Sequence, residues 1–309
     1  MNKVSIVMAT YNGETYIREQ IESILSSDYR NFDLHIYDDG SSDATISILN
    51  EYKEKHPGKV HLYQNQKNLG VTKNFLKGIC NTNADYIMLS DQDDFWISDK
   101  ISLTLKKMKE MEESSSEGLP LAVFTDAIVV DKDLNLIDKS FFRSSALNPH
   151  KNDLAYLLME NKLIGCTVMI NSSLRQILKS RRLPINARLH DGWIGLIASA
   201  IGQVGYLDFP TLLYRQHDDN LVGNKGYLSY IKDRITSINK QRKALLASQR
   251  QAGEFYLLYE VFLGDKEKKI IKTFANLDKL DFISRRVELF RNGFWKSGFI
   301  RNLGVLIII

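Results

Sequence analysis

Three carboxylates lie within four residues at Asp91-Gln92-Asp93-Asp94, directly after the apolar run 86–89. An apolar run that ends in acidic residues is typical of a buried strand that opens into a loop. Alternate side chains of an extended segment point the same way, so Asp91 and Asp93 can reach one cation. Mg²⁺ or Mn²⁺ would relieve the repulsion and usually carries a substrate phosphate. The sequence therefore predicts a site for a metal-bound diphosphate, with a solvated acidic loop as the alternative.

Two earlier segments also place polar residues where a strand is expected to end. Thr10, Tyr11 and Glu14 follow the apolar run 4–9, and Asp38-Asp39 follows the run 32–37. These side chains can bind a base or a ribose, although ordinary capped turns are the alternative. Lys73 lies in a turn before a helix and could approach a phosphate there. A lone lysine is more often simply solvated.

The elements that must position these residues alternate between strands and helices. Strands are expected at 4–9, 32–37, 60–63 and 85–89, and helices at 15–26, 42–55, 71–80 and 98–112. This order predicts an α/β fold, with a mostly parallel sheet, helices on both faces and ligands beyond the carboxyl ends of the strands. Further strands are expected at 121–125, 127–130, 166–170, 206–207 and 212–215, with a hairpin turn at 131–135 and helices at 152–160 and 191–201.

The C-terminal part is expected to be only helical, at 227–251, 254–263, 266–277 and 279–290. We place a boundary near 222–226, which divides the chain into a catalytic part, 1–224, and a helical part, 225–309. The helical part carries 17 Lys/Arg against 8 Asp/Glu, which indicates an anionic partner surface.

Composition limits the remaining classes of protein. A chain of 309 residues with 44% hydrophobic and 25% charged residues can build a large core and is not disordered. Cys80 and Cys166 lie in apolar surroundings and are expected to be reduced and buried. The first residues lead straight into a strand, and no apolar run reaches the roughly 18 residues that span a bilayer. We therefore expect neither a signal peptide nor a transmembrane helix.

The motifs taken together resemble those of family 2 glycosyltransferases with the GT-A fold. The resemblance covers about residues 3–220 and rests on the segments 4–13, 37–43, 68–70 and 91–93. It implies a nucleotide-sugar donor, a divalent metal (Mn²⁺ or Mg²⁺) and inversion at the anomeric carbon. The strings Ser90–Trp96 and Tyr214–Asn220 are most similar to bacterial rhamnosyltransferases of cell-wall polysaccharide and O-antigen assembly.

The resemblance also implies roles for single residues. Asp39 would contact the base with Asp38 beside it, Asp91 would lie by the ribose, and Asp93 would hold the metal. The nucleotide pocket would be lined by Thr10, Tyr11 and Glu14.

Asp191 stands where the family keeps its catalytic base, although His190 precedes it where the family has an acidic residue. A plain helix N-cap is the alternative for Asp191. His217 could complete the metal site, and Arg215 and Gln216 could grip the diphosphate.

The resemblance to rhamnosyltransferases implies transfer of L-rhamnose from dTDP-L-rhamnose to a lipid-linked saccharide. A UDP-hexose or UDP-N-acetylhexosamine donor is the alternative. A sugar-phosphate nucleotidyltransferase is less favoured because Thr10–Glu14 is not the Gly-rich, Arg-containing loop that it needs. A non-catalytic scaffold would not need Asp93, Asp191 and His217 together. The QxxRW motif of processive synthases is absent.

The segment 285–301 interleaves cations with large apolar residues, and 303–309 is almost wholly apolar. This pattern predicts an interfacial segment on the inner face of the cytoplasmic membrane, with Trp295 and Phe299 at headgroup level. Basic–aromatic segments also bind nucleic acid, but a lipid-linked acceptor favours the membrane. The main alternatives are a homodimer interface and packing on the catalytic part.

Overall fold

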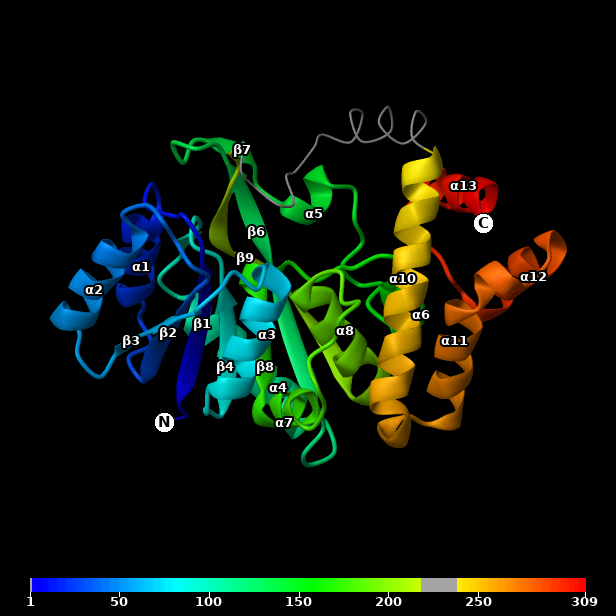
Figure 1. Ribbon diagram of the computed structural model, residues 1–309, viewed down its shortest axis with the longest axis horizontal. Coiled ribbons are helices and arrows are strands. Elements are labelled where there is room, and N and C mark those ends of the chain that lie inside the picture. The colour runs from blue at the N-terminus through cyan, green and yellow to red at the C-terminus, as the bar shows by residue number, and fades with distance from the viewer. Residues whose placement is uncertain (1, 218–237) are drawn as a thin grey trace.

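The computed structural model describes residues 2–217 and 238–309. Within them a nine-stranded mixed sheet runs through the molecule, with helices on its faces and four helices gathered on one side (Figure 1). The strand order is β3-β2-β1-β4-β8-β6-β9-β5, and β7 pairs with β6. This is the mixed α/β architecture that the alternating pattern predicts.

The first half of the sheet is parallel. Its strands are β1 (Val4–Thr10), β2 (Phe32–Asp38), β3 (Val60–Gln64) and β4 (Tyr86–Ser90). The helices between them are α1 (Ile17–Leu25), α2 (Thr45–Lys55) and α3 (Val71–Asn81). Because parallel strands end at the same edge, the loops after β1, β2 and β4 lie side by side there.

Burial explains why these segments fold this way. Every residue of β4 and all but one of β1 are buried, as expected for strands covered on both faces. In α1, Ile17, Ile21 and Ile24 recur at helical spacing and are fully buried against the sheet. The next helix, α4 (Lys100–Glu113), begins soon after the acidic segment.

In two places the second half of the sheet has one long strand where two were predicted. The expected strands 121–125 and 127–130 form one strand, β6 (Leu121–Val130), which makes the predicted hairpin with β7 (Leu136–Asp138). The expected pair 206–207 and 212–215 is likewise one strand, β9 (Gln203–Arg215). Long parallel pairing between β6 and β9, with register shifts near Asp126, carries both strands across their polar interruptions.

Shorter elements complete this half. Residues 166–170 are not one strand: a 3₁₀ turn, Gly165–Thr167, precedes β8 (Met169–Asn171). The helix expected at 152–160 is α6 (Leu154–Met159), and that at 191–201 is α8 (His190–Ile201). Elements that the pattern did not predict are β5 (Phe95–Trp96), α5 (Phe141–Ser144) and α7 (Ser172–Lys179).

The C-terminal helices lie on the side of the sheet away from α1 and α2 (Figure 1). They are α10 (Ile238–Tyr259), α11 (Asp265–Ala275), α12 (Phe282–Asn292) and α13 (Phe299–Ile308). The predicted boundary at 222–226 and the predicted helix start at 227 lie outside the described residues. The expected break near 251 is wrong, since α10 continues to Tyr259. No helix of the described ranges is both long and apolar enough to cross a bilayer.

These helices share one apolar core with the sheet. Trp193 of α8 packs edge-on against Phe255 of α10, with ring centroids 5.4 Å apart, and Tyr259 lies 6.0 Å away. A buried polar contact holds the end of the chain: Arg301 pairs with Glu160 at 3.2 Å, and the Lys162 ammonium donates to Ser297 Oγ at 2.6 Å. The last helices are therefore docked on the body of the protein.

Candidate active site

The carboxylate of Asp38 holds the loop after β2 through four hydrogen bonds. It is buried, and its Oδ2 accepts hydrogen bonds from the backbone N–H groups of Gly40 and Ser41 at 3.0 and 2.9 Å. Its Oδ1 accepts from the hydroxyls of Thr10 and Ser41 at 3.0 and 2.5 Å. These four bonds occupy the lone-pair sites of the carboxylate. Asp38 and Thr10 therefore stabilise the loops on which the site is built.

Asp39 joins the β2 loop to the turn before α3. Its Oδ1 accepts from Asn65 Nδ2 and from the Leu69 N–H, both at 2.8 Å. Its Oδ2 accepts from the Gly70 N–H at 2.8 Å. Three bonds leave a carboxylate capacity for one more donor, such as the N–H of a base. Of the two neighbouring aspartates, Asp39 is thus the better placed to meet a nucleotide.

The loop after β1 is tied to the acidic segment by Gln92. The Tyr11 N–H donates to Gln92 Oε1 at 2.9 Å, and Gln92 Nε2 donates to the Tyr11 carbonyl at 3.2 Å. The Tyr11 ring is exposed. Glu14 accepts from the Ala44 N–H at 2.7 Å and thereby supports the start of α2. Lys73 is exposed on α3, and no role beyond solvation follows from its place.

The three carboxylates of the acidic segment have different neighbours. Asp91 and Asp94 lie with Cys166, and their ligand atoms are within 4.8 Å of one another. Burial and then repulsion from neighbouring carboxylates raise the pKa of Asp91 well above its usual value and that of Asp94 to about 7. The pair is partly protonated at neutral pH, so a cation bound nearby would release protons.

Cys166 and Lys100 are buried beside this pair and were not predicted as site residues. Burial and the two carboxylates raise the pKa of the Cys166 thiol, which therefore stays protonated. Both cysteines are free thiols; Cys166 is buried as expected, whereas Cys80 is only half-buried. Burial lowers the pKa of Lys100 to about 8, and its ammonium donates to Thr211 Oγ1 at 3.0 Å. Hard cations prefer oxygen, so the carboxylates rather than the thiol fit Mg²⁺ or Mn²⁺.

Asp93 pairs with His217, from the other end of the catalytic part. His217 Nε2 lies 2.9 Å from Asp93 Oδ2, and 17% of the Asp93 side chain and 12% of the His217 side chain are exposed. The His217 ring also rests on the ring of Tyr16, with centroids 5.0 Å apart. A carboxylate oxygen and an imidazole nitrogen that converge from separate segments fit a divalent cation.

Arg215 holds this pair in place. Its Nε donates to the Asp93 carbonyl at 2.7 Å and its Nη1 to the Lys132 carbonyl at 2.5 Å, and its Nη2 pairs with Glu19. Its guanidinium lies 4.6 Å from the centre of the Tyr16 ring. Arg215 is buried, so its geometry assigns it to positioning the loop that carries Asp93. Contact of Arg215 with a diphosphate stays a prediction. The Gln216 N–H donates to the Val130 carbonyl at 2.9 Å, which extends the pairing of β9 with β6 by one residue, and contact of the Gln216 side chain with a diphosphate likewise stays a prediction.

Asp191 lies in the first turn of α8, but it is not the N-cap, which is Leu189. Its Oδ1 accepts from the Gly192 N–H at 2.6 Å. Burial raises the pKa of Asp191 to about 6. The carboxylate also repels Asp91, which places the two groups in one site. A carboxylate with this pKa can accept a proton from a substrate near neutral pH.

His190 departs from the acidic residue that the resemblance implies at this position. The ring is buried, stacks on Phe75 with centroids 3.9 Å apart, and has no hydrogen-bond partner among the residues described. Burial lowers its pKa to about 3, so it is neutral. Gly165 leaves the space that the ring fills, since a Cβ there would lie 2.7 Å from His190 Nε2. In the sequence, only the glycine before the predicted strand start at Cys166 could have indicated the contact between Gly165 and His190.

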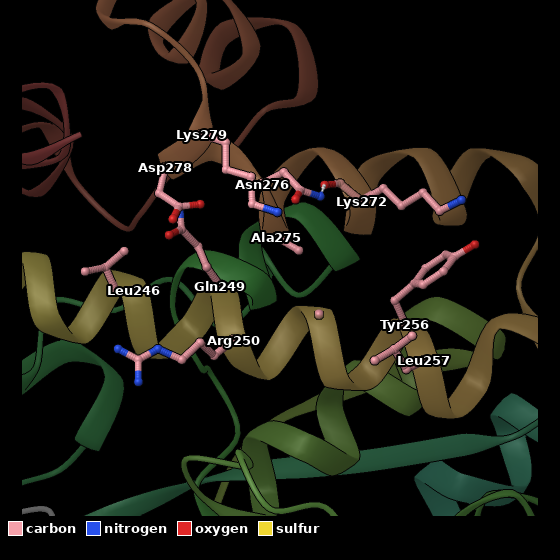
Figure 2. Close-up of a pocket in the computed structure, with 11 residues that line it drawn as sticks. Leu246, Gln249, Arg250, Tyr256, Leu257, Lys272, Ala275, Asn276, Asp278 and Lys279 are labelled. Atoms are coloured by element: carbon pink, nitrogen blue, oxygen red, sulfur yellow. Dashed lines mark hydrogen bonds between the residues drawn. The ribbon is translucent and has the colours of Figure 1, made fainter.

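A cleft of about 590 Å³ lies elsewhere, between α10 and α11 (Figure 2). Leu246 and Leu257 line it together with Arg250, Lys272 and Lys279. It contains none of the predicted site residues and only one carboxylate, that of Asp278. The candidate acid–base residues therefore lie at the edge of the sheet and not in this cleft.

Sequence comparison finds relatives over most of the chain. A family model described as glycosyl transferase family 2 matches residues 5–132. The dTDP-rhamnosyl transferase RfbG of Shigella flexneri is 30% identical over 228 residues, 70% of this chain and 73% of the relative. The putative glycosyltransferase EpsE of Bacillus subtilis is 30% identical over 232 residues, 75% and 78% of the two chains.

Structure comparison finds the same fold in two glycosyltransferases. S. aureus TarS 1-349 in complex with UDP-GlcNAc matches 95% of this chain and 93% of its own, with a TM-score of 0.55 at 15% identity. The mannosyltransferase PcManGT of Pyrobaculum calidifontis, in complex with GDP-Man and Mn²⁺, matches 99% and 79%, with a TM-score of 0.58 at 14% identity. At these identities the likeness concerns the fold alone.

Proposed function

Since the chain belongs to glycosyltransferase family 2 and is a glycosyltransferase, we propose that it is an inverting, metal-dependent rhamnosyltransferase. In this proposal dTDP-L-rhamnose is the donor, and the acceptor is a lipid-linked saccharide of bacterial cell-surface polysaccharide. The observation that carries it is the buried carboxylate of Asp191, whose pKa of about 6 suits a base, beside the acidic pair Asp91 and Asp94.

Asp191 acts as the base in this mechanism. It removes the proton from an acceptor hydroxyl while that oxygen attacks the anomeric carbon opposite the departing nucleoside diphosphate. The new C–O bond forms as the C–O bond to the diphosphate breaks, through a transition state with oxocarbenium character. One displacement inverts the anomeric centre. Asp39 receives the base of the donor through its remaining acceptor site, and Asp91 lies at the ribose.

Asp93 and His217 are the residues that would hold the divalent cation. When bound there, the cation would offset the charge that develops on the nucleoside diphosphate. A site with an imidazole ligand favours Mn²⁺ over Mg²⁺, which prefers oxygen ligands and bound water. The Mn²⁺ in the PcManGT complex supports this choice.

The donor is identified by release of nucleoside diphosphate from a panel of nucleotide sugars, with and without Mn²⁺. The name of RfbG supports dTDP-rhamnose, and the UDP-GlcNAc complex of TarS supports the alternative of a UDP-sugar. We expect metal-dependent turnover that is fastest with dTDP-L-rhamnose. Faster turnover with a UDP-hexose or UDP-N-acetylhexosamine would replace the rhamnose proposal, and metal-independent turnover would remove the role of Asp93 and His217.

We also propose that α12 and α13 rest on the anionic inner face of the cytoplasmic membrane, with 225–309 as the membrane-facing part of the protein. Large apolar side chains are exposed on both helices, and Phe290 and Phe299 are 65% and 77% exposed. Arg286 Nη2 donates to the Leu306 carbonyl, which joins the helices. Two of the expected contacts change: Trp295 is half-buried against Phe290, and Arg301 is buried against Glu160.

Flotation with anionic liposomes tests the membrane contact, and point variants are needed because a truncation would uncover Glu160 and Lys162. We expect Ile283→Ser with Phe299→Ser to release the protein from liposomes and to leave its thermal unfolding unchanged, because Ile283 is 70% exposed on α12 whereas Phe290 packs against Trp295. Leu257→Ser is the matched control, since Leu257 is equally exposed on α10. Unchanged flotation together with a smaller mass in light scattering would assign the surface to a homodimer instead.

A further inference from the structure

A second group of metal-ligating side chains lies on the same sheet, away from the carboxyl-end edge. Asp33 and His35 are two residues apart on β2, so their side chains share one face. His61 on β3 stands directly beside His35 in the parallel register. Asp33 is five residues before Asp38, roughly 16 Å along the strand, so this group is separate from the candidate active site.

The three side chains converge on one point. His35 Nε2 lies 3.1 Å and His61 Nε2 3.9 Å from the same oxygen, Asp33 Oδ2. Their ligand atoms all fall within 4.8 Å of one another. Ligands about 2.0 Å from a tetrahedral Zn²⁺ lie about 3.3 Å from one another, close to these spacings. His35 Nε2 is buried and has no hydrogen-bond partner among the described residues, although the carboxylate is near.

Two neighbours orient these ligands as outer-shell residues of metal sites do. Ser5 donates to Asp33 Oδ1 at 2.6 Å, which leaves Oδ2 turned toward the rings. The Tyr63 hydroxyl lies 3.3 Å from His35 Nδ1. With the proton on Nδ1 donated to Tyr63, His35 Nε2 presents its lone pair toward Asp33.

The charges around the group also suit a cation. The carboxylate of Asp33 already pairs with one positive charge in the structure. Lys3 is the competing cation: its ammonium lies 2.8 Å from Asp33 Oδ2, and its side chain is 52% exposed and free to move aside.

We propose that Asp33, His35 and His61 bind one divalent transition metal of the Zn²⁺ class, with water at the remaining position. Two imidazoles and a carboxylate are a donor set typical of Zn²⁺. The ion links β3, at the edge of the sheet, to β2. The site therefore stabilises the outer strands and takes no part in sugar transfer.

The test is calorimetric titration of the full chain with Zn²⁺, without donor or Mn²⁺. His61→Ala removes one of three ligands and is expected to weaken this binding step at least about 100-fold. Lys3→Gln is expected to tighten it about two- to fivefold, since Zn²⁺ no longer displaces an exposed ion pair. His150→Ala removes an exposed imidazole outside the group and is the matched control.

Zn²⁺ bound at Asp93 and His217 would give the same heat in all four proteins, so only the difference between variants counts. Loss of one equivalent in His61→Ala, with no loss in His150→Ala, supports the site. Identical titrations of the wild type and His61→Ala overturn it, as does weaker binding by Lys3→Gln. Thermal unfolding without Zn²⁺ checks that each variant is folded. None of these readouts depends on glycosyl transfer.

Discussion

Replacing Asp191 with Asn removes the proposed base and keeps the shape of the side chain. With a pKa of about 6, Asp191 is roughly 90% ionised at pH 7 and roughly 10% ionised at pH 5. Turnover of the wild type is therefore expected to fall roughly tenfold between these pH values. Asp191→Asn is expected to lower kcat by about 10²- to 10⁴-fold, the usual contribution of a general base, and to lose this acidic limb.

Asp191→Asn is expected to lower turnover without lowering the stability of the protein. The pKa of Asp191 is raised from 3.8 to about 6, so the folded protein holds its proton more tightly than the unfolded chain. The Asp191 contribution to stability is therefore fully present below pH 3.8 and is lost as the pH rises through about 6, a change of up to about 3 kcal/mol from this group alone. Asn carries no charge to bury, so the Tm of the variant at pH 7 is expected to equal or exceed that of the wild type.

The assay combines three measurements: kcat from nucleoside diphosphate release across pH 5–8, donor Kd from calorimetry, and Tm. Asp133→Asn makes the same chemical change in the exposed turn between β6 and β7 and is the control. An inactive, stable variant with an unchanged donor Kd is the expected result. If Asp191→Asn keeps more than about a tenth of wild-type turnover, the reasoning on the base is wrong.

Four further substitutions probe the surroundings of the site. Asp39→Asn should weaken donor binding at least about tenfold, whereas Asp38→Asn should mainly lower Tm, because Asp38 has no acceptor site left; calorimetry that finds equal losses of donor affinity would contradict this. Arg215→Lys cannot reach its three acceptors and should lower the free energy of unfolding by about 2–4 kcal/mol in denaturant titration, and an unchanged midpoint would count against the role of Arg215. Gly165→Ala should displace His190 and lower kcat more than donor affinity, and normal steady-state kinetics would show that the space is not needed.

The parallel half of the fold and its edge could be predicted from sequence because their causes are local. Apolar or alternating segments of five to seven residues that lead into Asp, Asn or Gly within a few residues mark β1, β2 and β4 without knowledge of any partner. The edge then follows from the topology of parallel strands. Polar residues inside β9, such as Asp208, hid its continuity, because pairing with β6 overrides the local pattern there.

The roles of single site residues were harder to predict because long-range contacts decide them. Asp38 and Asp39 are adjacent in sequence, yet one has all its acceptor sites occupied and the other does not. In the sequence, Cys166 is a residue of an apolar segment and Lys100 is a residue at a helix start. Only the fold places both of them beside Asp94. Similarly, an arginine beside the expected site indicated a diphosphate ligand, because guanidinium groups often bind phosphates. In the structure the Arg215 guanidinium instead contacts three distant segments of the protein.

The contacts of Arg215 also bear on when the site forms during synthesis. Its partners Glu19, Asp93 and Lys132 precede it by 196, 122 and 83 residues. Contacts of such high sequence separation form late, because the loops between them must close first. A nascent chain that ends before residue 215 can build β1 to β4, but it lacks Arg215, which holds the loop that carries Asp93. Ribosome-bound chains should therefore gain Mn²⁺ affinity in one step, only after β9 and His217 have left the exit tunnel.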